Sequence, residues 1–112
     1  MSQKKRNRAE FYDRMLNIIG GFGEPGNIDL YNRPVIRNED GSISTVASMT
    51  IDDDDGYRVL PTVFEDGIVE PREAIKRAYK SRKHLGRFPN LKLADLYAQV
   101  LHKQQEHLYS GY

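Results

Sequence analysis

The sequence of 112 residues predicts an α+β fold: a small antiparallel three- to four-stranded β-meander packed by two C-terminal helices, with an N-terminal amphipathic helical arm. Three observations lead to this prediction. Apolar and polar residues alternate between glycine-containing turns in the middle of the chain, apolar residues recur at helical spacing near both ends, and a glycine cluster follows the first helical segment. We therefore divide the chain into a basic arm, residues 1–25, and a single α+β domain, residues 26–112.

The arm begins with residues 1–7, which are polar and basic and are predicted to be irregular. Residues 8–19 then predict an amphipathic helix, and Gly20-Gly21 ends it. A helix of about 12 residues is marginal alone, so it must dock either on the sheet of its own chain or on another chain. Residues 20–27, GGFGEPGN, are typical of a loop and equally of a hinge. The apolar face of the helix is formed by Phe11, Tyr12, Met15, Leu16, Ile18 and Ile19.

The strands follow the glycine cluster. Residues 34–37 predict a first strand and residues 38–42 a tight turn. Residues 43–51 alternate and predict a second strand, with a turn over residues 52–56 and a third strand over residues 57–64 that is kinked near Pro61. A further turn at residues 65–67 allows a short pairing at Ile68-Val69. The predicted inner face of the second strand is Ile43, Thr45, Ala47, Met49 and Ile51.

Two helices complete the prediction, since a sheet this small needs a helix on one face. Pro71 suits the first position of a helix, and the basic residues at 80–83 suit its last turn. Residues 84–90 predict a loop, and residues 91–108 predict the last helix. The predicted apolar faces are Ala74, Ile75, Ala78 and Tyr79 in the first of these helices, and Leu93, Leu96, Tyr97, Val100, Leu101, Gln104 and Leu108 in the second.

Charge is distributed unevenly, although the net charge is only +1. The first eight residues are basic, residues 39–70 are acidic with Arg58 as the sole base, and residues 72–87 are basic with Glu73 as the sole acid. Two interpretations remain open. The charges either cover solvated faces and turns, or they make a dipolar subunit whose acidic turns meet a neighbour's basic helix.

No motif for catalysis, cofactor binding or metal binding is present with the spacing that its chemistry requires. The chain has no Cys, which excludes disulfides and thiolate metal sites. The run at residues 52–55 does not fit a calcium-binding EF-hand loop, because Gly56 at the sixth position places Ile51 first and Thr62 twelfth. The three histidines lack the HExxH spacing of a zinc site, no GxSxG motif surrounds a serine, and the glycine cluster matches no phosphate-binding motif. We expect no catalytic residue, cofactor or metal.

The composition bears on two classes of partner, membranes and nucleic acids. No apolar run approaches the roughly 20 residues of a membrane span, and the basic N-terminus lacks the apolar core of a signal peptide. The basic segment 72–87 interleaves Tyr79, His84 and Phe88 and can contact phosphates, although the acidic strands nearby weaken its field. Nucleic-acid binding is therefore the alternative rather than the favoured interpretation.

From about residue 26 to residue 105 the chain resembles a small module of tailed-bacteriophage gene products, found both alone and within larger virion-associated proteins. The matching residues are Gly26-Asn27-Ile28-Asp29-Leu30, Arg33-Pro34-Val35, Asn38, DGSISTV at residues 40–46, Leu60-Pro61-Thr62-Val63, Asp66-Gly67, Glu73-Ala74-Ile75, Tyr79, Lys83-His84-Leu85-Gly86, Phe88, Ala94-Asp95, Tyr97-Ala98, Leu101-His102 and Gln104-Gln105. The four-Asp turn and Ser81-Arg82, where Thr-Gly is commoner, depart from that pattern, and the arm lies outside it.

The resemblance implies a phage origin and virion association, and it supplies no catalytic residue. We therefore expect a non-enzymatic virion protein that binds capsid, portal or tail proteins in multiple copies, made in the host bacterial cytoplasm. The alternative is a small nucleic-acid-binding or host-directed regulatory protein. The residues expected to bind partners are Phe11, Tyr12, Met15, Leu16, Ile18, Ile19, Lys80, Arg82 and Lys83.

Overall fold

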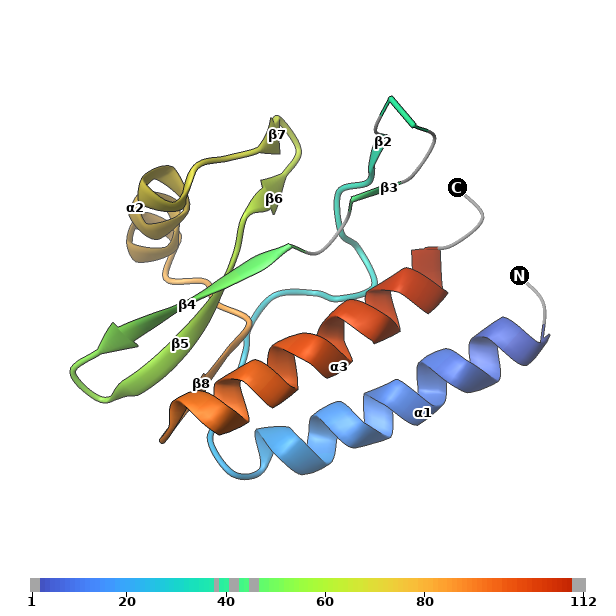
Figure 1. The fold of residues 1–112 in the computed structure, drawn as a ribbon, viewed down its shortest axis with the longest axis horizontal. Helices are drawn as coiled ribbons and strands as arrows, with labels where there is room; N and C mark the ends of the chain where they lie inside the picture. The colour runs from blue at the N-terminus through green and yellow to red at the C-terminus, as the bar shows by residue number, and fades with distance from the viewer. Residues whose placement is uncertain (1–2, 38, 41–42, 45–46, 110–112) are drawn as a thin grey trace.

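The computed structural model describes residues 3–37, 39–40, 43–44 and 47–109, and Figure 1 shows their arrangement. Its helices are α1 (Gln3–Gly20), α2 (Pro71–Ser81) and α3 (Leu91–Tyr109). They pack on an antiparallel sheet, so the predicted α+β class is confirmed. The helix of the arm starts earlier than the sequence predicts, because residues 3–7 already belong to α1 rather than to an irregular segment.

The main sheet has four strands in the order β1-β8-β5-β4, all antiparallel. Strands β4 (Ser48–Asp53) and β5 (Gly56–Pro61) form the predicted hairpin, with Gly56 at a φ of 144° that favours glycine. The other two strands, β1 (Glu24–Pro25) and β8 (Gly86–Phe88), lie in segments predicted as loops. That prediction is wrong because strands this short show no alternation, and their state depends on pairing with distant residues.

The remaining strands form two separate ribbons rather than extending a meander. Strands β2 (Ile36–Arg37) and β3 (Ile43–Ser44) pair with each other, and β6 (Val63–Phe64) pairs with β7 (Gly67–Ile68). The predicted strand at residues 34–37 is therefore not part of the main sheet, and the predicted strand at residues 43–51 is divided between β3 and β4. The turn at 38–42 lies largely outside the described residues, as does Thr45 of the predicted inner face.

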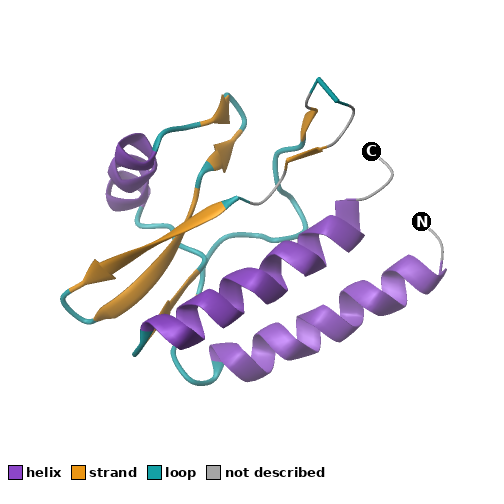
Figure 2. Cartoon of the chain, viewed as in Figure 1, coloured by secondary structure: helices purple, strands orange, loops and turns teal. Residues whose placement is uncertain are grey.

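The core lies between the sheet and two helices, α1 and α3, which run side by side on one side of it, with α2 on the other side (Figure 2). Val59 of β5 and the β8 residue Phe88 face α3, and the ring of Phe88 lies 4.8 Å from that of Tyr97. The buried residues of this core are Leu16, Ile19, Val59, Leu85, Phe88, Ala94, Tyr97, Val100 and Leu101.

Helix α1 is thus built into the same core as the sheet. Leu16 and Ile19 are only 6% and 5% exposed, and the expected hinge contributes β1 to the sheet edge. The sequence left open whether this helix docks on its own chain, and the structure places it against α3. The division into an arm, residues 1–25, and a domain, residues 26–112, stays a prediction; in the structure α1 packs against α3 and Glu24-Pro25 pairs with β8.

The two C-terminal helices bury most of the faces that their periodicity predicts. In α2, Ala74 and Ala78 are buried but Tyr79 is 59% exposed, and in α3 Leu96 is 43% exposed. Tyr79 and Leu96 each lie at the edge of the apolar face of their helix, outside the area that neighbouring elements cover. The second strand shows a similar departure, since Ala47 is exposed although the alternation places it inward.

Polar side chains also hold α1 and α3 to the segment between them. Asp13 accepts hydrogen bonds from Tyr31 and from the buried Gln104, and these contacts span the two helices. Gln105, also buried, donates to the backbone oxygen of Leu30 at 2.7 Å. Burial and the Asp13 carboxylate raise the pKa of Tyr31 to about 12. The loop after β1 is therefore fixed to both helices.

Candidate functional site

A groove of about 600 Å³ opens between α2 and the chain that follows β1. Its volume is within the range of small-ligand and side-chain binding sites. We call it the Arg33 groove. It is lined by Ile28, Asp29, Asn32, Arg33, Pro34, Pro61, Phe64, Glu65, Asp66, Ala74, Arg77, Ala78, Ser81 and Lys83.

Arg33 is held in this groove by both its backbone and its side chain. Its backbone N–H donates to the Tyr109 hydroxyl at 2.9 Å, and its Nη2 donates to the Val63 carbonyl at 2.6 Å. Its Nε atom is buried and has no hydrogen-bond partner. Burial lowers the pKa of the Arg33 guanidinium from its ordinary value. Across residues 3–37, 39–40, 43–44 and 47–109, no carboxylate lies within ion-pair distance of this guanidinium.

Arg77 also lines the groove, but unlike Arg33 it is paired with carboxylates. Its Nη1 and Nη2 donate to the two oxygens of Asp66 at 2.8 Å each, and its Nε donates to Glu73 at 3.1 Å. The Arg77 hydrogen bonds hold the pKa of the Asp66 carboxyl below its usual range. The guanidinium carbon also lies 4.7 Å from the centre of the Phe64 ring. The charge of Arg77 is matched locally, so this residue shapes the groove.

One predicted partner residue, Lys83, lines the Arg33 groove, and it is exposed. Lys80 and Arg82 are also exposed but do not line it. Arg82 has a φ of 60° and its N–H donates to the Ala78 carbonyl, which closes the end of α2. The basic end of α2 therefore flanks the groove, and Lys83 alone of the three extends into it.

The residues predicted for partner binding on α1 divide between two faces. Leu16 and Ile19 are buried within this chain, which corrects their assignment as a free surface. Tyr12 stacks on His107 at 5.3 Å, and Met15 packs against the core. Phe11 and Ile18 are 54% and 64% exposed. Since α1 and α2 lie on opposite sides of the sheet, the structure does not bring the two predicted groups together (Figure 1).

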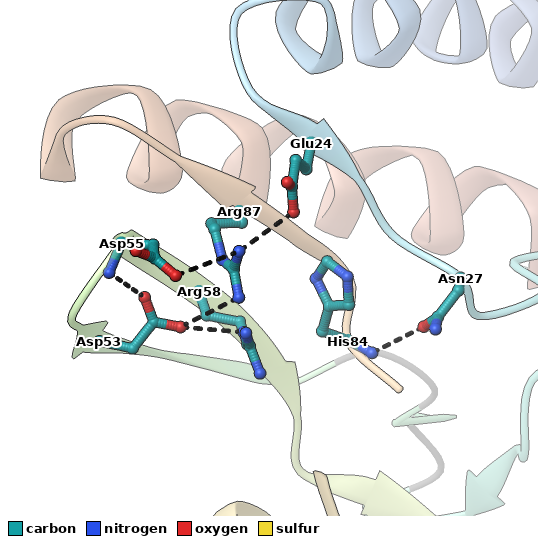
Figure 3. Close-up of polar contacts among 7 residues, drawn as sticks. All are labelled: Glu24, Asn27, Asp53, Asp55, Arg58, His84 and Arg87. Atoms are coloured by element: carbon teal, nitrogen blue, oxygen red, sulfur yellow. Dashed lines mark hydrogen bonds and ion pairs between the residues drawn. The ribbon is translucent and has the colours of Figure 1, made fainter. Parts of the chain in front are cut away.

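A second polar cluster lies across the sheet near the acidic turn (Figure 3). Arg58 and Arg87 are directly opposite on β5 and β8, and Asp53 lies 3.1 Å from the first and 3.6 Å from the second. Arg87 also pairs with Glu24 of β1 at 3.2 Å. Asp53 accepts a hydrogen bond from the backbone N–H of Asp55, which stabilises the turn. These ion pairs join all four strands, although Asp53 Oδ2 and the Nε atoms of Arg58 and Arg87 are buried without a hydrogen bond of good geometry.

Two motifs that the sequence singles out contact each other beside this cluster. The Asn27 side chain accepts from the His84 N–H at 2.9 Å and donates to the Arg82 carbonyl at 2.9 Å. A Cβ at Gly26 would lie 2.3 Å from the Leu85 oxygen, so only glycine allows this approach. The GNIDL and KHLG stretches thus meet across more than fifty residues of sequence, and their polar groups are used to join β1 to β8 (Figure 3).

Among the residues that the structure describes, no three His, Asp and Glu side chains converge as the ligands of a metal ion would. Of the helices that the structure describes, none is both long and apolar enough to cross a bilayer.

Arg33 is the site residue that sequence reasoning missed. It occurs in the segment Arg33-Pro34-Val35, which was noticed only as part of a family pattern. A lone arginine before a proline looks like any surface base, and its burial depends on α3, β6 and α2 together. No signal within the neighbouring residues distinguishes it.

Comparisons with known proteins add no assignment: no family model, no curated protein and no solved structure matches the chain.

Proposed function

We propose that this chain is a non-enzymatic bacteriophage virion protein that binds capsid, portal or tail proteins in multiple copies, and that the Arg33 groove receives an acidic side chain of such a partner. The phage assignment rests on the resemblance of the GNIDL, DGSISTV and KHLG stretches. The observation that supports partner binding in the groove is the Arg33 guanidinium, which has no carboxylate partner within the described part of the chain and a buried Nε without a hydrogen bond.

The physical argument concerns the cost of burying charge. A half-buried guanidinium without a carboxylate loses hydration and gains only the hydrogen bond to Val63. A carboxylate that enters the groove offsets that cost and forms a charge-assisted hydrogen bond, with Lys83 as a second cation at the rim. The apolar lining of Ile28, Pro34 and Phe64 suits the neighbours of an acidic side chain in a folded or extended partner.

Helix α1 offers a second contact surface. Phe11 and Ile18 are seven residues apart, which places them on one side of the helix, and both are more than half exposed. Exposed aromatic and aliphatic side chains of this size are common anchors of protein interfaces. We retain these two residues as the partner contacts of α1.

The experiment uses purified particles of a phage that carries this sequence. Mass spectrometry of the particles should detect the chain at several copies per particle. Complementation with Arg33→Gln should reduce its incorporation at least fivefold, while the exposed α3 substitution Lys92→Gln should leave incorporation unchanged. Absence of the chain from purified particles contradicts the virion assignment, and normal incorporation of folded Arg33→Gln contradicts the groove.

The alternative, nucleic-acid binding, rests on the exposed cluster Lys80, Arg82 and Lys83 beside the exposed ring of Tyr79. A protein that uses these bases on phosphates must lose affinity steeply as salt rises. The test is retention on DNA at 50 and 200 mM salt, with the three bases changed to Glu. Retention that depends on neither salt nor these residues excludes the alternative.

A further inference from the structure

Strand β4 is an edge of the main sheet, and no other strand of the described residues pairs with its outer side. It is the last strand in the order β1-β8-β5-β4 and has six residues, whereas β1 at the other edge has two. A free edge carries a row of backbone N–H and C=O groups that can pair with another strand. A strand that pairs there must match the backbone groups of β4 that face outward.

The hydrogen bonds of the β4–β5 hairpin show which backbone groups of β4 face outward. The Thr62 N–H donates to the Ala47 carbonyl, so residues 47, 49, 51 and 53 face β5. The Val59 carbonyl accepts from the Leu85 N–H on the other side of β5, so its partner Thr50 does not bond to β5. Pro61 has no N–H and lies opposite Ser48, which fits the same alternation. The backbone groups of Ser48, Thr50 and Asp52 therefore point out of the sheet.

Along its centre, at Met49-Thr50-Ile51, this edge lacks the features by which proteins usually prevent pairing. Natural edge strands carry inward-pointing charges, lysine, proline or a bulge. The β4 ladder is regular from Ser48 to Asp53, and the Met49-Thr50-Ile51 segment is uncharged and favours strand. The acidic residues are confined to the end of the strand and the turn that follows. The strand is thus open to pairing along its centre.

We propose that two copies of this chain pair through β4, antiparallel, with Thr50 opposite Thr50 of the second copy. In this register Ser48 lies opposite Asp52 of the second copy, and Asp52 opposite Ser48. Each of these pairs exchanges two backbone hydrogen bonds, because their groups already face outward. The Thr–Thr pair and the Ser–Asp pairs are favourable cross-strand neighbours. The result is one continuous sheet through both copies.

The number of outward-facing pairs favours this register for a second copy of the chain, because centring on Thr50 pairs Ser48, Thr50 and Asp52 of both copies, whereas centring on Met49 or Ile51 pairs only two of the three. Centring on Asp52 would place that carboxylate against its own copy, and centring on Ser48 would leave a single paired residue within β4. With Thr50 at the centre, Ala47 lies opposite Asp53 of the other copy, and the turns at residues 54–55 lie at opposite ends of the paired strands. The edge is therefore its own complement. The inference is independent of the Arg33 groove.

The test measures the dimer dissociation constant of the full chain by sedimentation velocity over a range of concentrations. Ser48→Lys places an ammonium opposite Asp52 of the second copy and should tighten the dimer, and Ser48→Glu places like charges there and should weaken it. Two symmetric pairs change in each dimer, so we expect about fivefold in each direction. Gln99→Lys and Gln99→Glu, on exposed α3, are the matched controls and should leave the dissociation constant unchanged.

A third variant tests the centre of the register. Thr50→Lys brings two ammonium groups together and should make the chain monomeric, and a circular dichroism melt verifies that it is folded. A chain that is monomeric at all concentrations overturns the proposal. So does a dimer whose dissociation constant is the same for Ser48→Lys and Ser48→Glu. Neither outcome affects the virion assignment, which is tested on particles.

Discussion

Single residues hold β1 and β8 together, and one of the close contacts between the two segments is at Gly26. The strands are short, and their pairing depends on backbone atoms approaching more closely than a side chain permits. Gly26 lies against the carbonyls of Leu85 and His84, and the Asn27 amide bonds the same segment. Packing therefore accounts for the glycine and the asparagine at these positions.

Gly26→Ala should therefore lower the free energy of unfolding by about 2–3 kcal/mol, since the new Cβ meets rigid backbone atoms. Gly20→Ala is the matched control. Nothing lies within 4 Å of a Cβ at Gly20, and alanine favours the helix by up to about 1 kcal/mol. Urea denaturation measures both. Equal free energies for the two variants would contradict the close approach of β1 and β8.

At the scale of elements, the docking of α1 on α3 decides whether the N-terminal helix is a free arm. Ile18 and Ile19 are adjacent and chemically identical, but they are 64% and 5% exposed. Comparing substitutions at these two positions therefore separates the effect of burial on stability from the effect of helix propensity. Helix α2 is attached differently, because Arg77 connects it to the β6–β7 ribbon through Asp66.

Ile19→Ala should destabilise the chain by about 2–4 kcal/mol, because it removes buried methyl groups and leaves a cavity. Ile18→Ala should change the free energy of unfolding by less than about 0.5 kcal/mol. Thermal or urea unfolding of both variants provides the measurement. If the two substitutions cost the same, α1 does not dock in solution as the structure shows.

The ion pair of α2 makes a prediction about pH. The pKa of Asp66 is lowered in the fold, so its contribution to stability is present above the pKa of the unfolded chain and is lost as pH falls through the folded value. Arg77→Gln should return the pKa of Asp66 towards that of an ordinary aspartate, whereas the exposed substitution Lys76→Gln should not. Carbon-13 NMR titration of the carboxyl measures this. An Asp66 pKa that is the same in Arg77→Gln and the wild type would show that the pair does not form.

At the scale of the molecule, one core joins α1, β5, β8 and α3, whereas Ala74 and Ala78 of α2 are buried outside it. Leu16 and Ile19 of α1 belong to the same buried cluster as Val100 and Leu101 of α3. The proposed binding surfaces lie outside this core, at the Arg33 groove, on the outer side of α1 and along β4. The proposed partner contacts therefore need no rearrangement of the fold.

Deleting residues 1–22 should abolish cooperative unfolding, because the buried face of α3 loses its cover. Deleting residues 1–7 should preserve it, since the contacts from Tyr12 to Ile19 remain. Circular dichroism melts and the dispersion of proton–nitrogen NMR spectra distinguish the two. A folded, cooperative chain without residues 1–22 would restore the separate arm that the sequence predicts.

The fold was predictable where the signal is local. The periodicity of residues 91–108 predicts α3, Pro71 and the following stripe predict α2, and the glycines at 56 and 67 predict their turns. Strand β8 was not predictable, because Gly86-Arg87-Phe88 resembles a loop until β5 lies beside it. For the candidate site, Lys83 was anticipated from its charge, but Arg33 was not, since its burial depends on Tyr109 and Val63.

The sequence by itself determined the helices, the hairpin turns, the α+β class and the separation of charge along the chain. Each of these depends on residues within a few positions of one another. Only the tertiary structure decided that α1 joins the core, that β1 and β8 complete the sheet, and that Arg33 has no counter-charge among the residues that the structure describes. These features are sums over contacts between segments tens of residues apart, and no single segment contains enough of the interaction energy to reveal them.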